Sequence, residues 1–363
     1  MKIGIDAKAL RTSFPHGVKS YAQNLLVNLA KIDKKNEYII FSSKKIRIPK
    51  QRNFRLIVFP NALPILKRQL LTPFYVMKER IDIFHNLEPF GSVFLNHSKV
   101  VTTVHDINLS GTFPLFSKYF LERIYCEFTR SLVLQKSLAI ITDSEAIQKE
   151  LSERQNVAKR TVVRVIYLGY NKEFFTFENY KKRSGILYMG DLFGRKNILR
   201  EIKAYSDLPL GLKRVHKLKI ISSTKFAADN FKKLIRKFGI EKFAEIYVGI
   251  RTEQLAELYN RTALFVYASL YEGFGIPILE AMACGCPVVT SNYGAMKEIA
   301  GDAALFANPR SEKSISESIY KMCNDYSLRR TLVKKGLRRV KRFNWMDTAK
   351  KTLELYRDVY RMQ

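Results

Sequence analysis

Two glutamates, Glu272 and Glu280, lie eight positions apart on either side of a glycine-containing turn. The turn follows an apolar run, Ala263 to Ala268, that predicts a buried parallel strand, and a helix is expected to open after it. Ligands of open α/β sheets bind at this place, the carboxyl end of a strand, and the free N–H groups of a helix start favour a diphosphate. The pattern predicts two carboxylates in one cleft beside an anion site. The alternative is a solvent-facing glutamate and a helix-capping one.

A second glycine-bearing turn contains Gly190, Arg195 and Lys196 and follows the apolar run Ile186 to Met189. Glycines let the backbone approach a ligand, and adjacent cations neutralise a diphosphate. The alternative is an ordinary strand–helix turn with basic residues at its end.

The stretch from Tyr267 to Thr290 resembles the Glu-x7-Glu signature of retaining, nucleotide-sugar-dependent glycosyltransferases of family 4, which have the GT-B fold. Glu-Gly-Phe-Gly stands at the first glutamate and Glu-Ala-Met-Ala-x-Gly-x-Pro-Val-Val at the second. The resemblance implies that Arg195 and Lys196 stabilise charge on the leaving nucleoside diphosphate. It also implies that Glu272 binds hydroxyls of the transferred sugar and Glu280 those of the ribose. The donor-binding residues that it implies are Gly17, Gly190, Arg195, Lys196, Arg251 beside the base, Glu272, Gly273, Phe274, Gly275 and Glu280.

The first half of the chain is similar to the family more loosely. Gly17 stands where the family has a glycine-rich loop, although His16 replaces one of its usual two glycines. His105 ends an apolar strand, and the family has a histidine there near the transferred sugar and the acceptor; the alternative is a histidine bonded locally to Asp106. Ser144 resembles the family's serine at the next strand end. The resemblance thus implies acceptor-binding roles for His105 and Ser144.

Short β-branched runs alternate with amphipathic segments along the whole chain, which predicts doubly wound, mainly parallel sheets. The pattern restarts after a polar linker near residues 169–183. We therefore expect an α/β protein with two Rossmann-like domains, 1–170 and 171–345, facing a cleft as in GT-B enzymes. By resemblance only, a C-terminal helix, 346–363, is expected to cross back to the first domain. The strands expected are Lys2–Asp6, Glu37–Phe41, Phe54–Phe59, Ile81–Phe84, Val100–Val104, Ala139–Thr142, Ile186–Met189, Lys217–Ile221, Ala244–Val248, Leu264–Ala268 and Pro287–Thr290.

The chain has 363 residues, with 63 Lys and Arg against 33 Asp and Glu, a formal net charge of +30. This charge indicates an anionic partner, which is a nucleic acid, an acidic membrane surface or a polyanionic substrate, unless it reflects only a biased surface. The start of the chain, Met1 to Asp6, leads directly into an expected strand, so no signal peptide is expected. No apolar run approaches the roughly 20 residues that span a bilayer. The cysteines are expected to be reduced, and Cys284 and Cys286 to lie in an apolar helix.

Basic residues interleaved with aromatic and aliphatic ones recur in the first half, for example in Lys44–Arg55, Lys67–Arg80 and Phe113–Gln135. Such a mixture is what binding to an anionic lipid surface needs. We expect a cytoplasmic enzyme, peripheral on the inner face of the plasma membrane, that acts on a lipid-linked or glycan acceptor.

The hypothesis is a retaining hexosyltransferase, with His105, Arg195, Lys196 and Glu272 as catalytic residues. The first domain, including Thr103–Asp106 and the Phe-Pro at positions 113–114, is similar to bacterial O-antigen mannosyltransferases, so mannose from GDP-mannose is the leading donor. No metal is expected because no Asp-x-Asp ends a strand, and no cofactor and no nucleic-acid partner are expected. The alternatives are a UDP-sugar-dependent transferase, a sugar-nucleotide epimerase of the same shape, and a basic nucleic-acid-binding protein.

Overall fold

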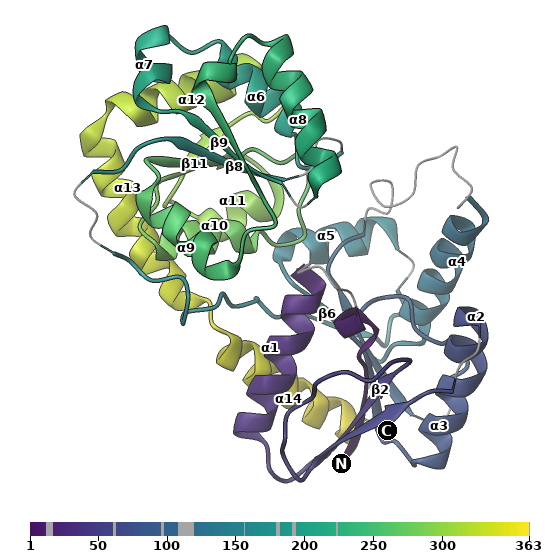
Figure 1. The fold of residues 1–363 in the computed structure, drawn as a ribbon. Coiled ribbons are helices and arrows are strands. Elements are labelled where there is room, and N and C mark those ends of the chain that lie inside the picture. Colours follow the sequence, from purple (N-terminus) through teal and green to yellow (C-terminus); the bar gives the residue numbers. More distant parts are fainter. Residues whose placement is uncertain are drawn as a thin grey trace. The chain divides into compact units, whose positions relative to one another are not determined.

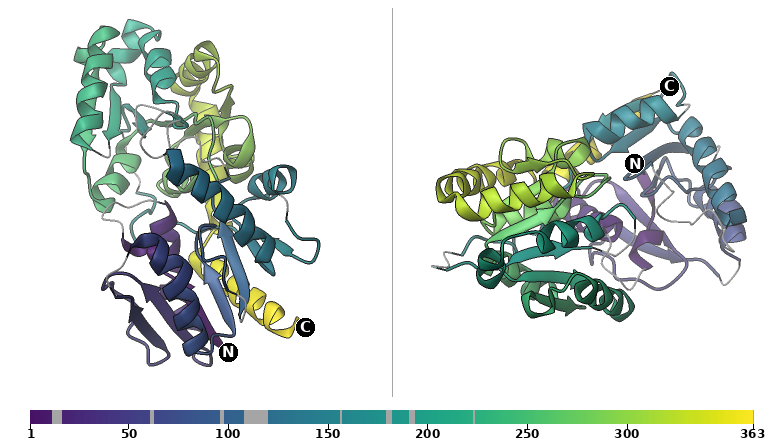
Figure 2. Two further views of the ribbon diagram at one scale, coloured as in Figure 1. Left: turned by 90° about the vertical axis from the view of Figure 1, so that its right-hand side faces the viewer. Right: turned by 90° about the horizontal axis from the view of Figure 1, so that it is seen from above.

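A computed structural model describes most of the chain as two compact units, unit 1 (Met1–Gly169 with Asn344–Gln363) and unit 2 (Tyr170–Phe343) (Figures 1 and 2). Each unit has its own sheet and its own core. The structure describes residues 1–11, 17–60, 63–95, 98–107, 120–155, 157–178, 182–190, 194–222 and 224–362.

The sheet of unit 1 is entirely parallel, with strand order β3-β2-β1-β4-β5-β6-β7. The order reverses between β1 and β4, which makes the sheet doubly wound and confirms the expected fold class for this half. Its β-branched strands are covered on both faces, as parallel strands require. The strands are β1 (Lys2–Asp6), β2 (Glu37–Ser42), β3 (Phe54–Val58), β4 (Ile83–Asn86), β5 (Lys99–Val104), β6 (Ala139–Thr142) and β7 (Val162–Val165).

Helices from both ends of the chain cover unit 1. The C-terminal helix α14 packs against α1 (Figure 1), and the Tyr356 hydroxyl of α14 lies 2.6 Å from Nδ1 of His85 on β4. The helices are α1 (Gly17–Ile32), α2 (Pro64–Leu66), α3 (Thr72–Lys78), α4 (Phe120–Lys136), α5 (Glu145–Arg154) and α14 (Trp345–Arg361), with a 3-10 turn at Lys8–Arg11 and a π-helical turn at Lys67–Leu71.

The sheet of unit 2 is also parallel, with strand order β10-β9-β8-β11-β12-β13, and reverses between β8 and β11. It is therefore the second doubly wound domain that the alternation of patterns predicts. The strands are β8 (Ile186–Met189), β9 (Leu218–Ser222), β10 (Ala244–Val248), β11 (Leu264–Tyr267), β12 (Val288–Ser291) and β13 (Leu305–Ala307). The helices are α6 (Ile198–Ser206), α7 (Leu210–Val215), α8 (Lys225–Lys237), α9 (Thr252–Arg261), α10 (Ile276–Ala283), α11 (Gly294–Ala300), α12 (Glu312–Asn324) and α13 (Tyr326–Arg339).

One expected helix ends earlier than its apolar pattern indicates. The helix α10 stops at Ala283 because Gly285 adopts a left-handed φ of 64°, so Cys286 lies beyond the helix rather than within it. Cys284 and Cys286 are both buried and free.

Candidate active site

Glu272 lies in the loop between β11 and α10 and is held by two cations from the loop after β8. Its Oε2 atom lies 2.9 Å from Nη1 of Arg195, and its Oε1 atom lies 2.7 Å from Nζ of Lys196. The Glu272 side chain is only 7% exposed, whereas those of Arg195 and Lys196 are 40% and 27% exposed. The buried carboxylate therefore anchors two cations whose other sides are open to solvent.

The charge balance of this cluster is set by the two cations. Burial raises the pKa of the Glu272 carboxyl, but Lys196 and Arg195 outweigh it and hold that pKa below its ordinary value. Lys196 also donates a hydrogen bond to the Tyr267 hydroxyl, and its Nζ atom lies 4.8 Å from the centre of that ring. At neutral pH the cluster carries two positive charges and one negative charge, so it retains an attraction for an anion.

The two loops are joined by hydrogen bonds that fix the cations. The Asn197 side-chain amide donates to the backbone oxygens of Ala268 at 2.8 Å and Pro309 at 2.7 Å. Gly190 lies beside Lys196, where an added Cβ would come within 2.8 Å of the lysine Cβ, and its φ of 156° is one that favours glycine. Because these positions are fixed before a ligand enters, little reorganisation is needed to bind one.

The buried carboxyl group of Glu201 supports the same loops through a hydrogen bond to the backbone. Oε1 of Glu201, on α6, accepts the Ala268 N–H at 2.5 Å, and the Leu270 N–H donates to the Arg195 backbone oxygen at 2.7 Å. Burial raises the pKa of Glu201 to about 8. At neutral pH it is therefore largely a neutral, hydrogen-bonding support for the strand end.

The loop after Glu272 leads into α10 through one buried residue and one residue with a left-handed backbone. Gly275 has a φ of 105° and caps the helix, and Phe274 is buried with its ring 6.0 Å from that of Phe343. Glu280, one turn further along α10, is half-buried, and its partial burial raises its pKa to about 8. No residue within the described ranges hydrogen-bonds its carboxyl group, which leaves the group available to a ligand hydroxyl. Gly273 is buried in the same loop.

Arg251 lies apart from this cluster in the same unit. It follows β10 and is exposed at the start of α9, where its N–H donates to Oε1 of Gln254 at 2.9 Å. The strand β10 is three positions from β11 in the sheet, which is ~14 Å at ~4.8 Å per strand.

In unit 1, His105 follows β5 and is bonded through both ring nitrogens. Nδ1 lies 2.6 Å from Oδ2 of Asp143, and Nε2 lies 3.0 Å from the Leu87 backbone oxygen. Burial lowers the pKa of His105, but Asp143 outweighs this effect and the net pKa lies above its ordinary value. The local alternative named the wrong carboxylate, because the carboxylate bonded to the ring is Asp143, at the end of the adjacent strand β6, rather than Asp106.

Ser144 and Gly17, the other two expected site residues of unit 1, both lie at the starts of helices. Ser144 is fully buried and caps α5, because its hydroxyl accepts the Ile147 N–H at 3.2 Å. Gly17 opens α1 with no atom within 4 Å of an added Cβ, while His16 lies outside the described residues. The structure thus brings Arg195, Lys196 and Glu272 together in unit 2, and it assigns Ser144 a helix-capping hydrogen bond.

The second unit matches a known family over nearly its whole length. Residues 170–339 match the family model for glycosyl transferases group 1. This chain therefore contains a glycosyl transferases group 1 domain. It is 29% identical over 322 residues to O-antigen chain mannosyltransferase B of Escherichia coli, which covers 84% of this chain and 83% of that protein. It is also 28% identical over 276 residues to serotype-specific mannosyltransferase WbdA of Escherichia coli, covering 70% of this chain and 33% of that longer protein.

The glycosyltransferase also shares its fold with solved structures. Sucrose-phosphate synthase (tll1590) from Thermosynechococcus elongatus aligns with a TM-score of 0.79 at 19% identity, covering 99% of each chain. The fold class is therefore GT-B. Across the parts of the chain that the structure describes, no helix combines the length and apolar character that crossing a membrane requires.

Three residues beside the candidate site residues were not predicted: Asp143 in unit 1, and Glu201 and Tyr267 in unit 2. Asp143 had a detectable signal, because it ends the strand next to the one that His105 ends, and carboxyl ends of adjacent parallel strands lie together. Glu201 and Tyr267 had none, since a glutamate in a helix and a tyrosine in a strand are ordinary.

Proposed function

We propose that this glycosyltransferase moves a hexose, with mannose from GDP-mannose as the leading candidate, onto a lipid-linked or polysaccharide acceptor with retention of configuration. The observation that carries the proposal is the cluster of Arg195, Lys196 and Glu272 at the carboxyl ends of β8 and β11. The names of the two mannosyltransferase relatives support the choice of sugar. A UDP-sugar donor is the alternative.

The cluster is suited to a sugar diphosphate because it offers both kinds of partner. Arg195 and Lys196 have open sides that face solvent, and a diphosphate would supply them with anionic oxygens. Glu272 offers carboxylate oxygens to the hydroxyls of the sugar beside that diphosphate. As the bond to the anomeric carbon breaks, negative charge grows on the phosphate oxygen, and fixed cations stabilise that charge most.

The remaining expected donor residues are assigned to the other parts of the nucleotide, which are the ribose, the diphosphate and the base. Glu280 accepts ribose hydroxyls, and the loop from Gly273 to Gly275 presents backbone near the diphosphate. Arg251, which follows β10 in the same sheet, contacts the base. This arrangement requires Glu280 to ionise or to share its proton with the ribose, because its pKa is about 8 in the free protein.

The proposed chemistry needs no protein nucleophile and no metal. The departing phosphate oxygen accepts the proton of the acceptor hydroxyl as that hydroxyl attacks the same face of the sugar. Both ring nitrogens of His105 are bonded within unit 1, to Asp143 and to Leu87, so its role toward the acceptor requires Nε2 to exchange the Leu87 oxygen for an acceptor hydroxyl. The His–Asp pair fixes the orientation of the ring, which a loose histidine would lose.

We further propose that unit 1 docks on the anionic inner leaflet through an apolar surface bordered by cations, here called the docking face. Gln69 joins the elements that form it, because its amide donates to the Tyr125 hydroxyl at 2.9 Å and its oxygen accepts the Val93 N–H at 3.0 Å. Lys67, Arg68 and Lys78 lie on the same helical segment. The exposed apolar residues of the docking face are Leu63, Ile65, Leu66, Leu70, Phe74, Met77, Phe94, Ile124 and Phe128.

Two measurements test the proposal. Incubation with radiolabelled GDP-mannose or UDP-sugars and a membrane extract should transfer label to a lipid-extractable or polymeric product, whereas incubation with donor alone should not yield an epimerised nucleotide sugar. Co-sedimentation with phosphatidylglycerol vesicles should decrease with added salt. Absence of any transfer product with either donor rejects the enzymatic proposal, and binding to duplex DNA without binding a sugar nucleotide favours the nucleic-acid alternative.

A further inference from the structure

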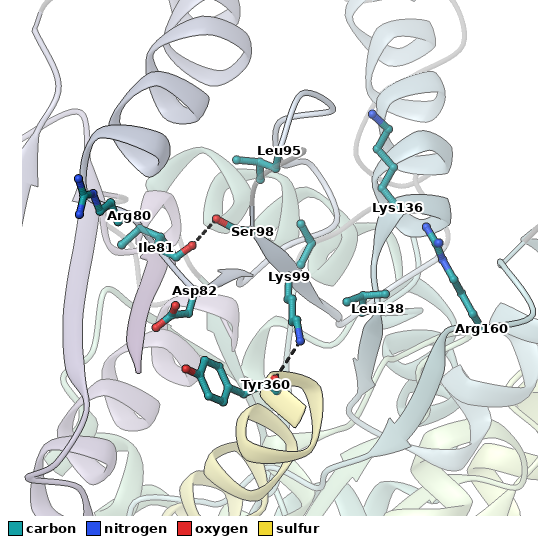
Figure 3. Close-up of a pocket in the computed structure, with 11 residues that line it drawn as sticks. Arg80, Ile81, Asp82, Leu95, Ser98, Lys99, Lys136, Leu138, Arg160 and Tyr360 are labelled. Atoms are coloured by element: carbon teal, nitrogen blue, oxygen red, sulfur yellow. Dashed lines mark hydrogen bonds between the residues drawn. The ribbon is translucent and has the colours of Figure 1, made fainter. Parts of the chain in front are cut away.

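Unit 1 contains a cavity of about 690 Å³ at the amino-terminal edge of its sheet (Figure 3). Asp82 immediately precedes β4, Lys99 opens β5, and Arg160 lies just before β7. His105 follows the other end of β5, ~20 Å from Lys99 at ~3.3 Å per residue. The cavity is therefore separate from the candidate active site.

The charged residues around this cavity are predominantly cations. Among the described residues that line it, Arg80, Lys99, Lys136 and Arg160 are cations and Asp82 is the one carboxylate. The Asp82 Oδ2 atom already accepts the backbone N–H of Lys2 at 2.7 Å. A hollow lined by one sign of charge raises the local concentration of the opposite charge, so the cavity attracts anions.

The four cations differ in what they bind. Lys99 donates to the backbone oxygens of Tyr360 and Met362 at the end of α14, and Lys136 donates to the Val93 oxygen at 2.6 Å. The guanidinium groups of Arg80 and Arg160 make no hydrogen bond or ion pair with the residues that the structure describes, and both side chains are exposed. Two of the cations thus have donors available to a ligand.

Arg80 occupies a backbone position that normally favours glycine. It ends α3 in a Schellman turn, in which the Arg80 N–H donates to the Met77 oxygen at 3.0 Å and the Ile81 N–H to the Val76 oxygen at 3.1 Å. Its φ is 53°, a left-handed value that costs a non-glycine residue about 1 kcal/mol. Strained backbone of this kind concentrates at functional sites, which suggests that the Arg80 side chain is used.

The cavity is mixed in character and borders the docking face. Leu95 and Val100 form part of its wall, and both pack in the same core cluster as Val76 of α3. Arg80 follows the end of α3, and Lys136 is the last residue of α4, so both helices that carry the docking face end at the cavity (Figure 3). An amphiphile with a phosphate beside apolar carbons fits this lining better than a free phosphate does.

We propose that this cavity binds the phosphates of membrane lipid headgroups at its two ends, one at Arg80 and one at Arg160, because these residues lie three strands apart in the sheet, ~14 Å at ~4.8 Å per strand (Figure 3). The proposal rests on the membrane docking proposed above, because the docking face would bring the cavity to the level of the headgroups. It gives unit 1 a second anion site that is independent of the donor.

The test uses the full chain and phosphatidylcholine vesicles containing phosphatidylglycerol. Arg80→Asn with Arg160→Ser removes two cations, and asparagine tolerates the left-handed backbone. Lys31→Ser with Lys149→Ser makes the same charge change elsewhere on unit 1, at two exposed lysines. We expect the cavity pair to weaken vesicle binding roughly thirtyfold, about fivefold per cation. The control pair should weaken it by less than about threefold because the general field of unit 1 is only slightly reduced.

Soluble glycerol phosphate distinguishes the two sources of phosphate. It should displace the unaltered protein from vesicles only at millimolar concentration, since it lacks the apolar part. Equal losses of vesicle affinity in the cavity pair and the control pair would overturn the proposal that the cavity binds lipid phosphate. If glycerol phosphate binds tightly and needs Arg80 and Arg160, while the cavity pair binds vesicles as the unaltered protein does, the ligand is a soluble phosphate and not a lipid. Thermal unfolding of each variant verifies the fold. If the unaltered protein does not bind vesicles at all, the proposed membrane docking is rejected together with the lipid site. Binding of a nucleoside diphosphate then tests the donor site separately.

Discussion

The two units contain the same kind of sheet but use their carboxyl edges differently. In unit 2, Arg195 and Lys196 converge on buried Glu272, and hydrogen bonds between two loops hold them in place. In unit 1, the described part of the corresponding edge contains the His105–Asp143 pair. The doubly wound fold therefore supplies the location of a site, and the charges placed there decide what it binds.

This contrast suggests a division of labour. A site with net positive charge suits a diphosphate, because the negative charge of that group supplies most of the attraction. A compensated histidine–carboxylate pair suits neutral hydroxyl groups, which need direction rather than charge. We therefore expect changes in unit 2 to affect nucleotide binding and bond cleavage, and changes in unit 1 to affect transfer to the acceptor.

The largest expected effect is that of Lys196→Ala or Glu272→Ala. Each should lower kcat by roughly 10²-fold or more, because a fixed group that stabilises the transition state is lost. Removing Lys196 also leaves buried Glu272 with one cation instead of two. Initial rates of sugar transfer provide the measurement, and Lys313→Ala, at a side chain that is 86% exposed, is the control in the same unit. Near-normal turnover in both variants would reject the cluster.

A smaller effect in unit 1 should separate the two regions. Asp143→Asn should lower transfer to the acceptor about thirtyfold, because a neutral amide no longer holds the His105 ring or supports its charge. Binding of the nucleoside diphosphate, which concerns unit 2, should change less than twofold. The variant should also lose stability at low pH: the raised pKa of His105 stabilises the fold fully below the unfolded value of about 6.5 and progressively less as pH rises through the folded pKa. A loss of nucleotide affinity equal to the loss of transfer would remove the proposed division of labour.

Two glycines test whether the position of Lys196 matters in unit 2. Gly190→Ala should weaken nucleoside diphosphate binding about tenfold, because the new Cβ would lie 2.8 Å from the Lys196 Cβ and displace that residue. Gly194→Ala is the matched control: its φ of 89° is also unfavourable for alanine, but nothing lies within 4 Å of the added atom. Calorimetric titration of both variants measures the difference. Equal losses would mean that backbone strain, rather than the placement of Lys196, is responsible.

The smallest expected effect concerns the buried acid that supports the unit 2 loops. The pKa of Glu201 is raised to about 8 from 4.5, so its contribution favours the fold most at low pH and is lost as pH rises from about 4.5 to 8. Glu201→Gln keeps an acceptor for the Ala268 N–H and removes the titration. The free energy of unfolding should then fall less steeply with pH than in the unaltered protein, by about 1 kcal/mol per pH unit. Denaturation by urea at pH 5.5 and 7.5 gives both slopes, and identical slopes would contradict the assignment.

Much of the fold was predictable because apolar runs between polar turns mark buried parallel strands. The expected strand Lys2–Asp6 coincides with β1. Two strands were missed. The strand β7 is only partly buried at the sheet edge, and β13 has three residues, so neither gives a long apolar signal. The short helices α7 and α11 were missed for the same reason, since six or seven residues give little periodicity.

The components of the site were also predictable, but their mutual contacts were not. Motif resemblance singled out Arg195, Lys196 and Glu272, yet the ion pairs between them depend on β8 and β11 being neighbours although they are far apart in sequence. The cavity of unit 1 gave no signal, because Arg80, Lys136 and the other cations are isolated basic residues near strand or helix ends. Only the sheet order brings such residues together.

The central claim is that Arg195 and Lys196 hold a nucleoside diphosphate, and calorimetric titration tests it most directly. GDP and UDP are titrated into the unaltered protein, into Arg195→Ala with Lys196→Ala, and into Lys313→Ala. The account predicts that one of the two nucleotides binds the unaltered protein and the Lys313 variant with the same affinity, and binds the double variant at least a hundredfold more weakly, as the loss of two charge-assisted contacts implies. Equal affinity in all three proteins, or no binding of either nucleotide to the unaltered protein, would contradict it.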